Sequence, residues 1–220
     1  MEVKKDTNLL SKTEVTKLLN TLDNTYKEAK CGLDYTCPLD LTVALILAAQ
    51  CTDKRVNMIR PLVFDKYKDI YSLANANQTE LEDIIHSCGF YKNKAKNIIK
   101  MANTVIDKYN STIPNTMKKL TSLPGIGRKS ANIILQECFN ITEGIAVDTH
   151  VTRIAKKLGL TQNSNPINIE KDLMNILPKK YWNKINHILV CHGRNICDAK
   201  NPKCDICPVN SLCKSYLNSK

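Results

Sequence analysis

At the centre of the chain lies the run Leu120-Thr-Ser-Leu-Pro-Gly-Ile-Gly-Arg-Lys-Ser-Ala-Asn-Ile-Ile-Leu135. Apolar residues at three-residue intervals between positions 117 and 123 predict a short helix just before its Pro-Gly pair. Pro124 lacks a backbone N–H, so we expect that helix to end there. A second helix is expected to begin near Arg128, because apolar residues then recur at intervals of three and four. The run therefore predicts two helices joined by a tight turn.

The turn contains Gly125 and Gly127, which allow positive φ and let another backbone approach closely. The N–H groups at the start of the second helix, beside Arg128, have no partner within the helix, and with the helix dipole they form a site for an anion. For a basic protein the nearest polyanion is a nucleic acid, so these three residues are candidate DNA-binding residues. An ordinary helix turn would use the same glycines, and the pattern alone does not separate the two interpretations.

Lys129 lies in the first turn of the second helix, next to Arg128. The positive end of the helix dipole and the neighbouring guanidinium both disfavour a charged ammonium at this position. A neutral lysine can attack carbon and form a Schiff base, which makes Lys129 a candidate nucleophile. Considered alone, a surface lysine that binds phosphate is the simpler interpretation.

The composition limits the fold and the partners. The 220 residues suffice for one large or two small domains, and 5% aromatic residues with only 7 glycines favour helices over sheets. The formal net charge of +11, from 32 basic and 21 acidic side chains, favours a polyanionic partner. A lysine-rich proteome would produce the same charge, so charge alone is weak evidence for nucleic acid.

The location is expected to be cytoplasmic, in the bacterial cytosol and nucleoid. The chain opens on charged residues without the apolar core of a signal peptide, and its longest apolar run, residues 43–49, is too short to cross a bilayer. In a reducing cytosol, the 10 cysteines indicate metal ligands or buried thiols rather than disulfides.

Two capping boxes are predicted, one formed by Ser11 with Glu14 and one by Thr79 with Glu82. Residues 38–50 are apolar on nearly all sides of a helix, which predicts a central, buried helix.

Three further features mark helices. Pro61 is expected to kink its helix or end it early. Asp148 is expected to cap a helix that ends at Gly159. A basic helix follows Gly89, and four of its lysines are expected to face solvent, namely Lys92, Lys94, Lys96 and Lys100.

Four cysteines with the spacing C-x6-C-x2-C-x5-C follow within 17 residues: Cys197, Cys204, Cys207 and Cys213. A polar segment this short cannot bury four thiols in a core, so the spacing predicts a metal site. Four thiolates suit either tetrahedral zinc or a four-iron cluster, and the spacing does not distinguish them. Lys200 and Lys203 lie between the first two cysteines, where a rigid loop could hold both against phosphate.

Three motifs, in this order, closely resemble the endonuclease III family: Leu123-Pro-Gly-Ile-Gly-Arg-Lys-Ser-Ala131, Ala146-Val-Asp-Thr-His-Val-Thr-Arg153 and the cysteine spacing. The likeness covers roughly residues 10–215. It implies an all-α, two-domain helix-hairpin-helix DNA glycosylase fold with a C-terminal [4Fe-4S] cluster loop. Residues 31–142 would form a six-helix domain with the hairpin, and residues 1–30 and 143–220 would form the cluster domain.

The resemblance also implies roles for single residues. Lys129 matches the Schiff-base lysine and Asp148 the catalytic aspartate. Gln50 matches the residue that fills the space left by an extruded nucleotide, and Phe90 matches an apolar wedge that is more often leucine. The four cysteines match the cluster ligands. Ala48, where many members have serine, departs from the pattern.

The implied activity is that of a bifunctional enzyme of base excision repair. Such an enzyme removes oxidised pyrimidines from duplex DNA, acts as a monomer and cleaves the resulting AP site by β-elimination. Adenine glycosylases share the hairpin and the cluster but usually lack the lysine, so Lys129 argues against that branch. A non-catalytic DNA-binding or redox-sensing module is the alternative from another class.

Overall fold

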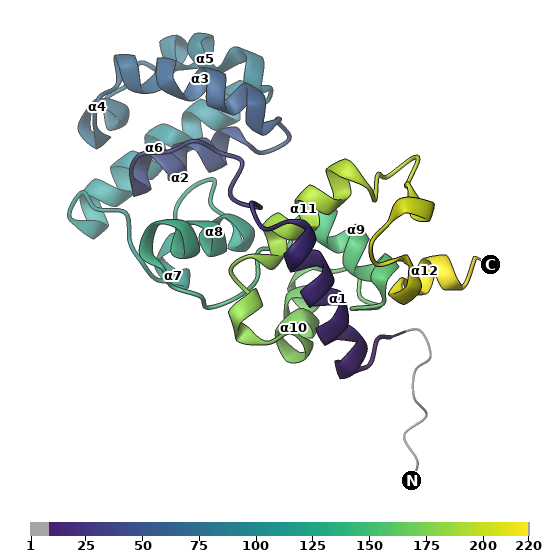
Figure 1. Ribbon diagram of the computed structural model, residues 1–220. Coiled ribbons are helices and arrows are strands. Elements are labelled where there is room, and N and C mark those ends of the chain that lie inside the picture. The colour runs from purple at the N-terminus through teal and green to yellow at the C-terminus, as the bar shows by residue number, and fades with distance from the viewer. Residues whose placement is uncertain (1–8, 220) are drawn as a thin grey trace. The chain divides into compact units, whose positions relative to one another are not determined.

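The computed structural model describes residues 9–219 (Figure 1). The regular elements of this part of the chain are helices, and no strand occurs among them, so the all-α fold class is confirmed. In chain order the helices are α1 (Lys12–Thr25), α2 (Pro38–Leu47), α3 (Asp53–Lys66), α4 (Ile70–Ala74), α5 (Gln78–Ile85), η1 (His86–Cys88), α6 (Tyr91–Tyr109), α7 (Met117–Leu120), α8 (Arg128–Phe139), α9 (Thr149–Leu158), α10 (Pro166–Ile176), η2 (Lys179–Tyr181), α11 (Ile185–Asn195), η3 (Cys204–Ile206), η4 (Asn210–Leu212) and α12 (Lys214–Leu217). None of the described helices is both long and apolar enough to cross a bilayer.

The chain divides into two compact units. We call Cys31–Glu143 the hairpin unit, because it contains α7 and α8. We call Met1–Lys30 together with Gly144–Lys220 the discontinuous unit, because it combines two distant parts of the sequence. That these units correspond to separately folding domains stays a prediction.

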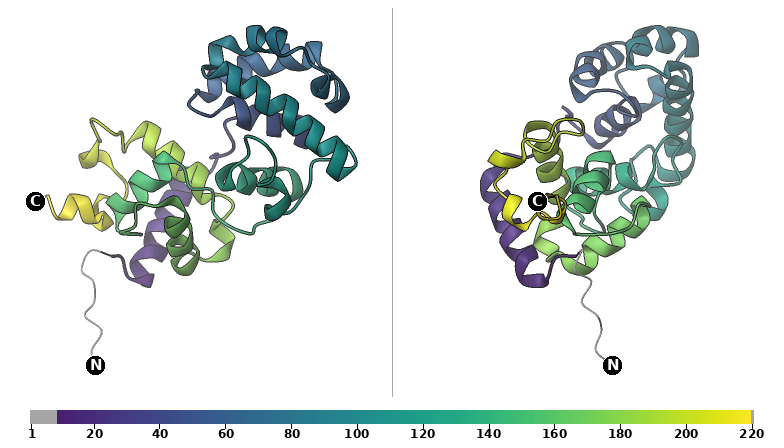
Figure 2. Two further views of the ribbon diagram at one scale, coloured as in Figure 1. Left: turned by 180° about the vertical axis from the view of Figure 1, so that it is seen from behind. Right: turned by 90° about the vertical axis from the view of Figure 1, so that its right-hand side faces the viewer.

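The discontinuous unit has one apolar core that α1 shares with α9, α10 and α11 (Figure 2). The apolar face of α1 contributes Val15, Leu18, Leu19 and Leu22, all at most 1% exposed. Polar contacts join the same segments: Nζ of Lys184 donates to both carboxylate oxygens of Asp23 at 2.6 Å. The first helix therefore depends on residues more than a hundred positions later.

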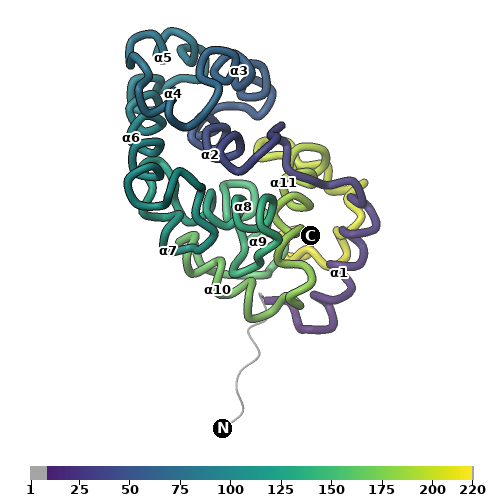
Figure 3. Tube along the Cα trace, turned by 90° about the vertical axis from the view of Figure 1, so that its left-hand side faces the viewer, coloured from purple at the N-terminus to yellow at the C-terminus, as the bar shows by residue number. Residues whose placement is uncertain are grey.

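The hairpin unit is built around α2, which packs against α3, α6 and α8 (Figure 3). Every residue of this helix from Asp40 to Leu47 is buried, as the apolar pattern predicted. The helix ends at Leu47 and not at Gln50, because the backbone at Gln50 has a positive φ of 53°. Gln50 therefore lies on an exposed turn that follows a fixed, central helix.

The capping predictions had different outcomes. Ser11 and Glu14 form the predicted capping box, with the Glu14 N–H donating to Oγ of Ser11 at 3.3 Å. The box at Thr79 and Glu82 is wrong. Asn77 caps α5 instead, because its Oδ1 accepts from the N–H of Thr79 at 3.0 Å and already satisfies the start of the helix.

Two expectations about helix interiors differ from the structure. The early end expected at Pro61 is wrong, since α3 continues to Lys66 and buried Ile59 and Val63 lie on both sides of the proline, while a kink there stays a prediction. Lys94 does not face solvent, since it is only 4% exposed and its ammonium group donates to backbone carbonyls inside the hairpin unit.

Candidate functional site

The turn between α7 and α8 places its two glycines in different surroundings. Gly125 has φ of +81°, and a Cβ there would lie 3.2 Å from Cβ of Asn97 and 3.2 Å from Cγ1 of Ile46. Gly127 has an ordinary φ of −93°, and a Cβ there would meet nothing within 4 Å. The fold itself therefore requires glycine at position 125. At position 127 the missing side chain leaves an open surface over the start of α8.

Helix α8 begins at Arg128, as predicted, and its N-cap is Gly127. Glycine has no side chain that could accept from the first N–H groups of the helix, so no side-chain cap is present. These N–H groups, together with the positive end of the helix dipole, form a site suited to an anionic oxygen. The exposed Arg128 adds a cation beside this site.

Lys129 lies in the first turn of α8 and is partly exposed. Its neighbour across the hairpin unit is Cys31: burial raises the pKa of the Cys31 thiol to about 11, and the positive charge of Lys129 acts against this rise. The sequence analysis did not connect these residues, because nearly a hundred positions separate them.

Asp148 is the N-cap of α9, as predicted, and one of its carboxylate oxygens, Oδ1, accepts from the N–H of Val151 at 2.8 Å. Within the described chain Oδ2 makes no hydrogen bond, so the cap leaves one oxygen for another partner. Asp148 belongs to the discontinuous unit and Lys129 to the hairpin unit.

Gln50 and Phe90 both adopt left-handed backbone conformations on exposed turns. Their φ angles are 53° and 47°, and Phe90 is 62% exposed. Positive φ is uncommon for residues with side chains and is a true outlier for bulky ones. Because such outliers cluster at active sites and ligand clamps, the two turns are candidates for contact with a ligand.

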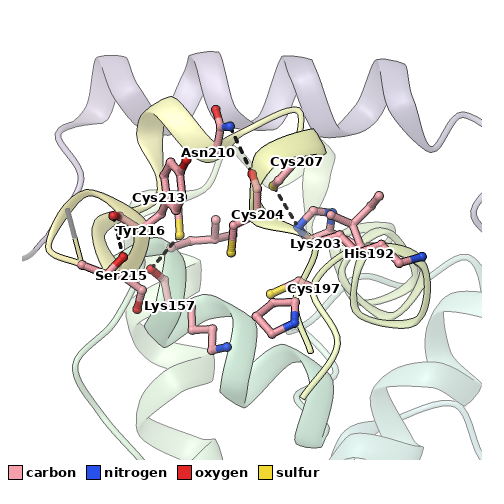
Figure 4. A pocket seen from close by; sticks show the side chains of 14 residues that line it. Lys157, His192, Cys197, Lys203, Cys204, Cys207, Asn210, Cys213, Ser215 and Tyr216 are labelled. Carbon is pink, nitrogen blue, oxygen red and sulfur yellow. Dashed lines mark hydrogen bonds between the residues drawn. The ribbon is translucent and has the colours of Figure 1, made fainter. Parts of the chain in front are cut away.

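The four cysteines of the C-terminal segment line one cavity of about 210 Å³ (Figure 4). All four are partly buried, and the lining is almost entirely apolar apart from their sulfur atoms. No three Cys, His, Asp or Glu side chains of residues 9–219 are gathered closely enough to hold a single metal ion. Sulfur atoms spaced around a cavity, rather than around a point, fit a cubic cluster better than tetrahedral zinc.

N–H groups of the protein lie close to two of these sulfur atoms. Nη1 of Arg153 donates to Sγ of Cys197 at 3.7 Å, and Nε2 of His192 lies 3.8 Å from Sγ of Cys207. Sulfur ligands with such neighbours are typical of iron–sulfur centres, whose potentials depend on them. The Cys213 thiol instead donates to the carbonyl oxygen of Lys157 at 3.3 Å.

The imidazole of His192 is itself held from its other side. Burial lowers the pKa of His192 to about 4, and the charge of Arg153 acts in the same direction, so the ring is neutral. Its Nδ1 lies 2.9 Å from the hydroxyl of Tyr26 in the chain that follows α1. The sequence analysis missed both residues, although the helical spacing from His192 to the first cysteine could have placed the histidine nearby.

Lys200 and Lys203 are both exposed on the loop between the first two cysteines. The loop backbone is held by two hydrogen bonds: the N–H of Lys200 donates to Oδ1 of Asp198 at 2.8 Å, and the N–H of Lys203 donates to the carbonyl of Ile196 at 2.9 Å. Both ammonium groups therefore lie on an ordered loop beside the cysteine cavity, where they can contact an anionic surface.

Comparison with known proteins identifies the class. Residues 43–179 match the HhH-GPD superfamily of base excision DNA repair proteins, and residues 197–213 match the iron–sulfur binding domain of endonuclease III. Endonuclease III of Synechocystis is 43% identical over 93% of both chains, and that of Bacillus subtilis is 38% identical over 94% of both chains. A trapped covalent complex of endonuclease III with DNA superposes with a TM-score of 0.91 at 37% identity, covering 96% of this chain and 99% of that one.

The chain is thus a helix-hairpin-helix protein of base excision DNA repair. Within that superfamily it belongs to the endonuclease III family, whose members are DNA glycosylases and AP lyases. Membership also settles the choice between zinc and iron that the cysteine spacing left open, because the family's C-terminal domain carries a [4Fe-4S] cluster.

Proposed function

We propose that this chain removes oxidised pyrimidines from duplex DNA and cleaves the resulting AP site, with Lys129 as the nucleophile. One observation carries the proposal: Lys129 lies in the first turn of a helix whose uncapped N-terminus is left open by Gly127. Similar solved structures are endonuclease III bound to DNA, both covalently and non-covalently. Its bacterial relatives support a place in the bacterial cytoplasm, and we propose that it acts there as a monomer.

DNA binding is assigned to two surfaces, one in each unit. In the hairpin unit, the turn at Gly125 and Gly127 with Arg128 binds a phosphate through backbone N–H groups and a cation. In the discontinuous unit, Lys200 and Lys203 bind phosphates from the ordered loop. Phosphate contacts position the protein but carry no sequence information, which suits an enzyme that must find lesions in any sequence.

The first chemical step replaces the damaged base. The target nucleotide leaves the stack, because C1′ cannot be reached inside the duplex. Nζ of Lys129, as the free amine that nucleophilic attack requires, forms a bond to C1′, and the bond from C1′ to the base breaks. The base departs with that electron pair and takes up a proton. In this step Asp148, through its free carboxylate oxygen, acts either as a base or as a stabiliser of positive charge on the sugar.

The second step breaks the strand. Opening of the sugar ring gives an imine between Nζ of Lys129 and C1′, and this imine acidifies the hydrogen on C2′. Loss of that proton expels the 3′ phosphate, which leaves with the electrons of the C3′–O bond. Water then hydrolyses the imine and restores the free lysine.

The [4Fe-4S] cluster has no step assigned in this sequence. Cys197, Cys204, Cys207 and Cys213 are the proposed ligands, and the cluster would cross-link their loop and supply an electron-transfer centre.

Trapping with borohydride tests the role of Lys129. Reduction of the imine joins enzyme and AP-site DNA covalently, so the parental protein should form a cross-linked band on a denaturing gel. Lys129→Gln cannot form an imine and should form none, while Lys96→Gln, an exposed change of the same kind, should trap normally. If Lys129→Gln still traps, another nucleophile does the chemistry. If neither the parental protein nor either variant is trapped, yet all three bind the DNA, the protein is a non-catalytic binding module.

A further inference from the structure

A single buried ammonium group connects two exposed turns of the hairpin unit. Nζ of Lys94 donates to the carbonyl oxygen of Leu47 at 2.8 Å and to that of Cys88 at 2.8 Å. No carboxylate in the described residues forms an ion pair with it. Burial lowers the pKa of Lys94, which reflects the cost of keeping this charge out of water. Lys94 therefore serves backbone carbonyls rather than an acidic side chain.

Both carbonyls lie at helix ends immediately before unusual turns. The Leu47 carbonyl ends α2, and Gln50 follows three residues later with φ of 53°. The Cys88 carbonyl ends η1, and Phe90 follows two residues later with φ of 47°. The last carbonyls of a helix have no partner within it, and they lie at the negative end of its dipole. One ammonium satisfies a carbonyl at each of these two ends.

A second link joins the same two turns. The thiols of Cys51, directly after Gln50, and Cys88, just before Gly89, are close enough to interact: burial raises the pKa of Cys88 to about 11, and Cys51 acts in the same direction. Cys88 is 2% exposed, so this contact is also inside the protein. Left-handed backbone is strained for a residue with a side chain and persists only where the surroundings hold it. The buried links provide that support beneath two exposed side chains.

We propose that Lys94 is a positioning residue that holds the Gln50 and Phe90 turns at one fixed spacing, so that both side chains enter a DNA duplex together. The proposal rests on the function proposed above and adds to it the roles that the family resemblance implies for these two side chains, beside an extruded nucleotide. Lys94 itself touches no DNA. Loss of its two hydrogen bonds frees each turn to move alone, which weakens insertion without weakening phosphate contacts.

Lys94→Met tests this inference, because methionine fills a similar volume and donates no hydrogen bond. The matched control is Lys96→Met, which removes the same charge from an exposed position on the same helix. Binding is measured to an undamaged duplex and to one carrying a tetrahydrofuran abasic analogue beside 2-aminopurine, whose fluorescence rises when the base unstacks. Compared with Lys96→Met, the Lys94→Met protein should bind the abasic duplex at least about tenfold more weakly and should no longer raise the 2-aminopurine fluorescence. Its affinity for undamaged DNA should differ by less than about twofold.

A double-mutant comparison separates positioning from general structural damage. In a Gln50→Ala/Phe90→Ala background, Lys94→Met should change abasic affinity by less than about twofold, because the side chains it positions are gone. An equal loss in both backgrounds, or a Lys94→Met protein that keeps full discrimination, overturns the inference. If circular dichroism shows that Lys94→Met is unfolded, the same affinity and fluorescence measurements are made with Lys94→Gln in both backgrounds. A parental protein that neither prefers the abasic duplex nor unstacks 2-aminopurine instead contradicts the proposed function of the two turns.

Discussion

The hydroxyl of Tyr26 lies 2.9 Å from Nδ1 of His192, although 166 positions separate the two residues. Burial raises the pKa of Tyr26 to about 12, so its hydroxyl stays protonated and is able to donate to the neutral imidazole. Because a Cys207 thiolate bound to a cluster can only accept, we infer that Nε2 of His192 carries the ring proton and that Nδ1 accepts from Tyr26. When Nδ1 accepts, the ring proton must be on Nε2. That nitrogen lies 3.8 Å from Sγ of Cys207 and can donate to it. Tyr26 therefore fixes the tautomer that supplies an N–H to a proposed cluster ligand.

Removal of the Tyr26 hydroxyl should shift the reduction potential of the cluster. Tyr26→Phe keeps the ring but leaves Nδ1 without its donor, so the Nε2–H tautomer is no longer enforced. Hydrogen bonds to ligand sulfur stabilise the reduced, more negative cluster, and we expect a more negative potential by protein-film voltammetry. Tyr181→Phe, which removes a hydroxyl bonded to Asn20 at 3.0 Å, is the control. Equal potentials in both variants would show that Tyr26 does not act on the cluster.

Replacement by alanine should lower the stability of the protein at one hairpin glycine and its DNA affinity at the other. Gly125→Ala places a Cβ in left-handed backbone and 3.2 Å from Ile46, so we expect a loss of about 1–3 kcal/mol in the free energy of unfolding. Gly127→Ala meets no atom of the chain within 4 Å, so stability should change little while DNA affinity falls, because the methyl group occupies the path of a phosphate. Thermal unfolding and binding titrations measure both. Unchanged DNA affinity in a folded Gly127→Ala protein would remove this turn from the interface.

Asp148→Asn should separate capping from chemistry. Asparagine caps a helix about as well as aspartate, so the bond to the Val151 N–H and the start of α9 should persist. The charge is lost, and base excision should fall by at least about a hundredfold, within the range for removal of a positioned acid–base or electrostatic group. Single-turnover excision of a defined oxidised pyrimidine is the measurement. A folded variant that excises at nearly the parental rate would leave Asp148 as a helix cap only.

The cluster loop should contribute to the salt dependence of binding. Each phosphate neutralised adds about 0.9 to the slope of log affinity against log salt. Replacement of both Lys200 and Lys203 by alanine should therefore lower that slope by about 1–2 and weaken all duplexes alike. Lys92→Ala/Lys96→Ala, an equal loss of charge from exposed positions on α6, is the control. Matching slopes for the two double variants would argue against a phosphate contact by this loop.

Local signals in the sequence predicted the hairpin and the cap at Asp148 well. The start of α8 could be predicted because a proline, two glycines and the first residues of a helical repeat lie next to one another in the sequence. The cap could be predicted because Asp148 directly precedes α9. Family resemblance supplied candidate roles for Lys129 and Asp148, which local chemistry alone left open.

Tertiary contacts account for what sequence reasoning missed. Lys94 was expected in solvent because its neighbours on α6 are lysines, yet its two acceptors come from segments 47 and 6 positions away. His192 and Tyr26 looked like ordinary residues of two unrelated helical regions. In each case a long-range packing contact, which no local period encodes, decides what the side chain does.

The two-part construction of the discontinuous unit has a consequence for synthesis on the ribosome. Leucines of α1 are covered by α9, α10 and α11, and the last of these ends at Asn195. At roughly 5–20 residues per second, α1 waits on the order of ten to thirty seconds for that cover, while the whole hairpin unit is synthesised in between. The helix α1 is therefore made before its cover exists, and during that delay its leucines are open to a chaperone.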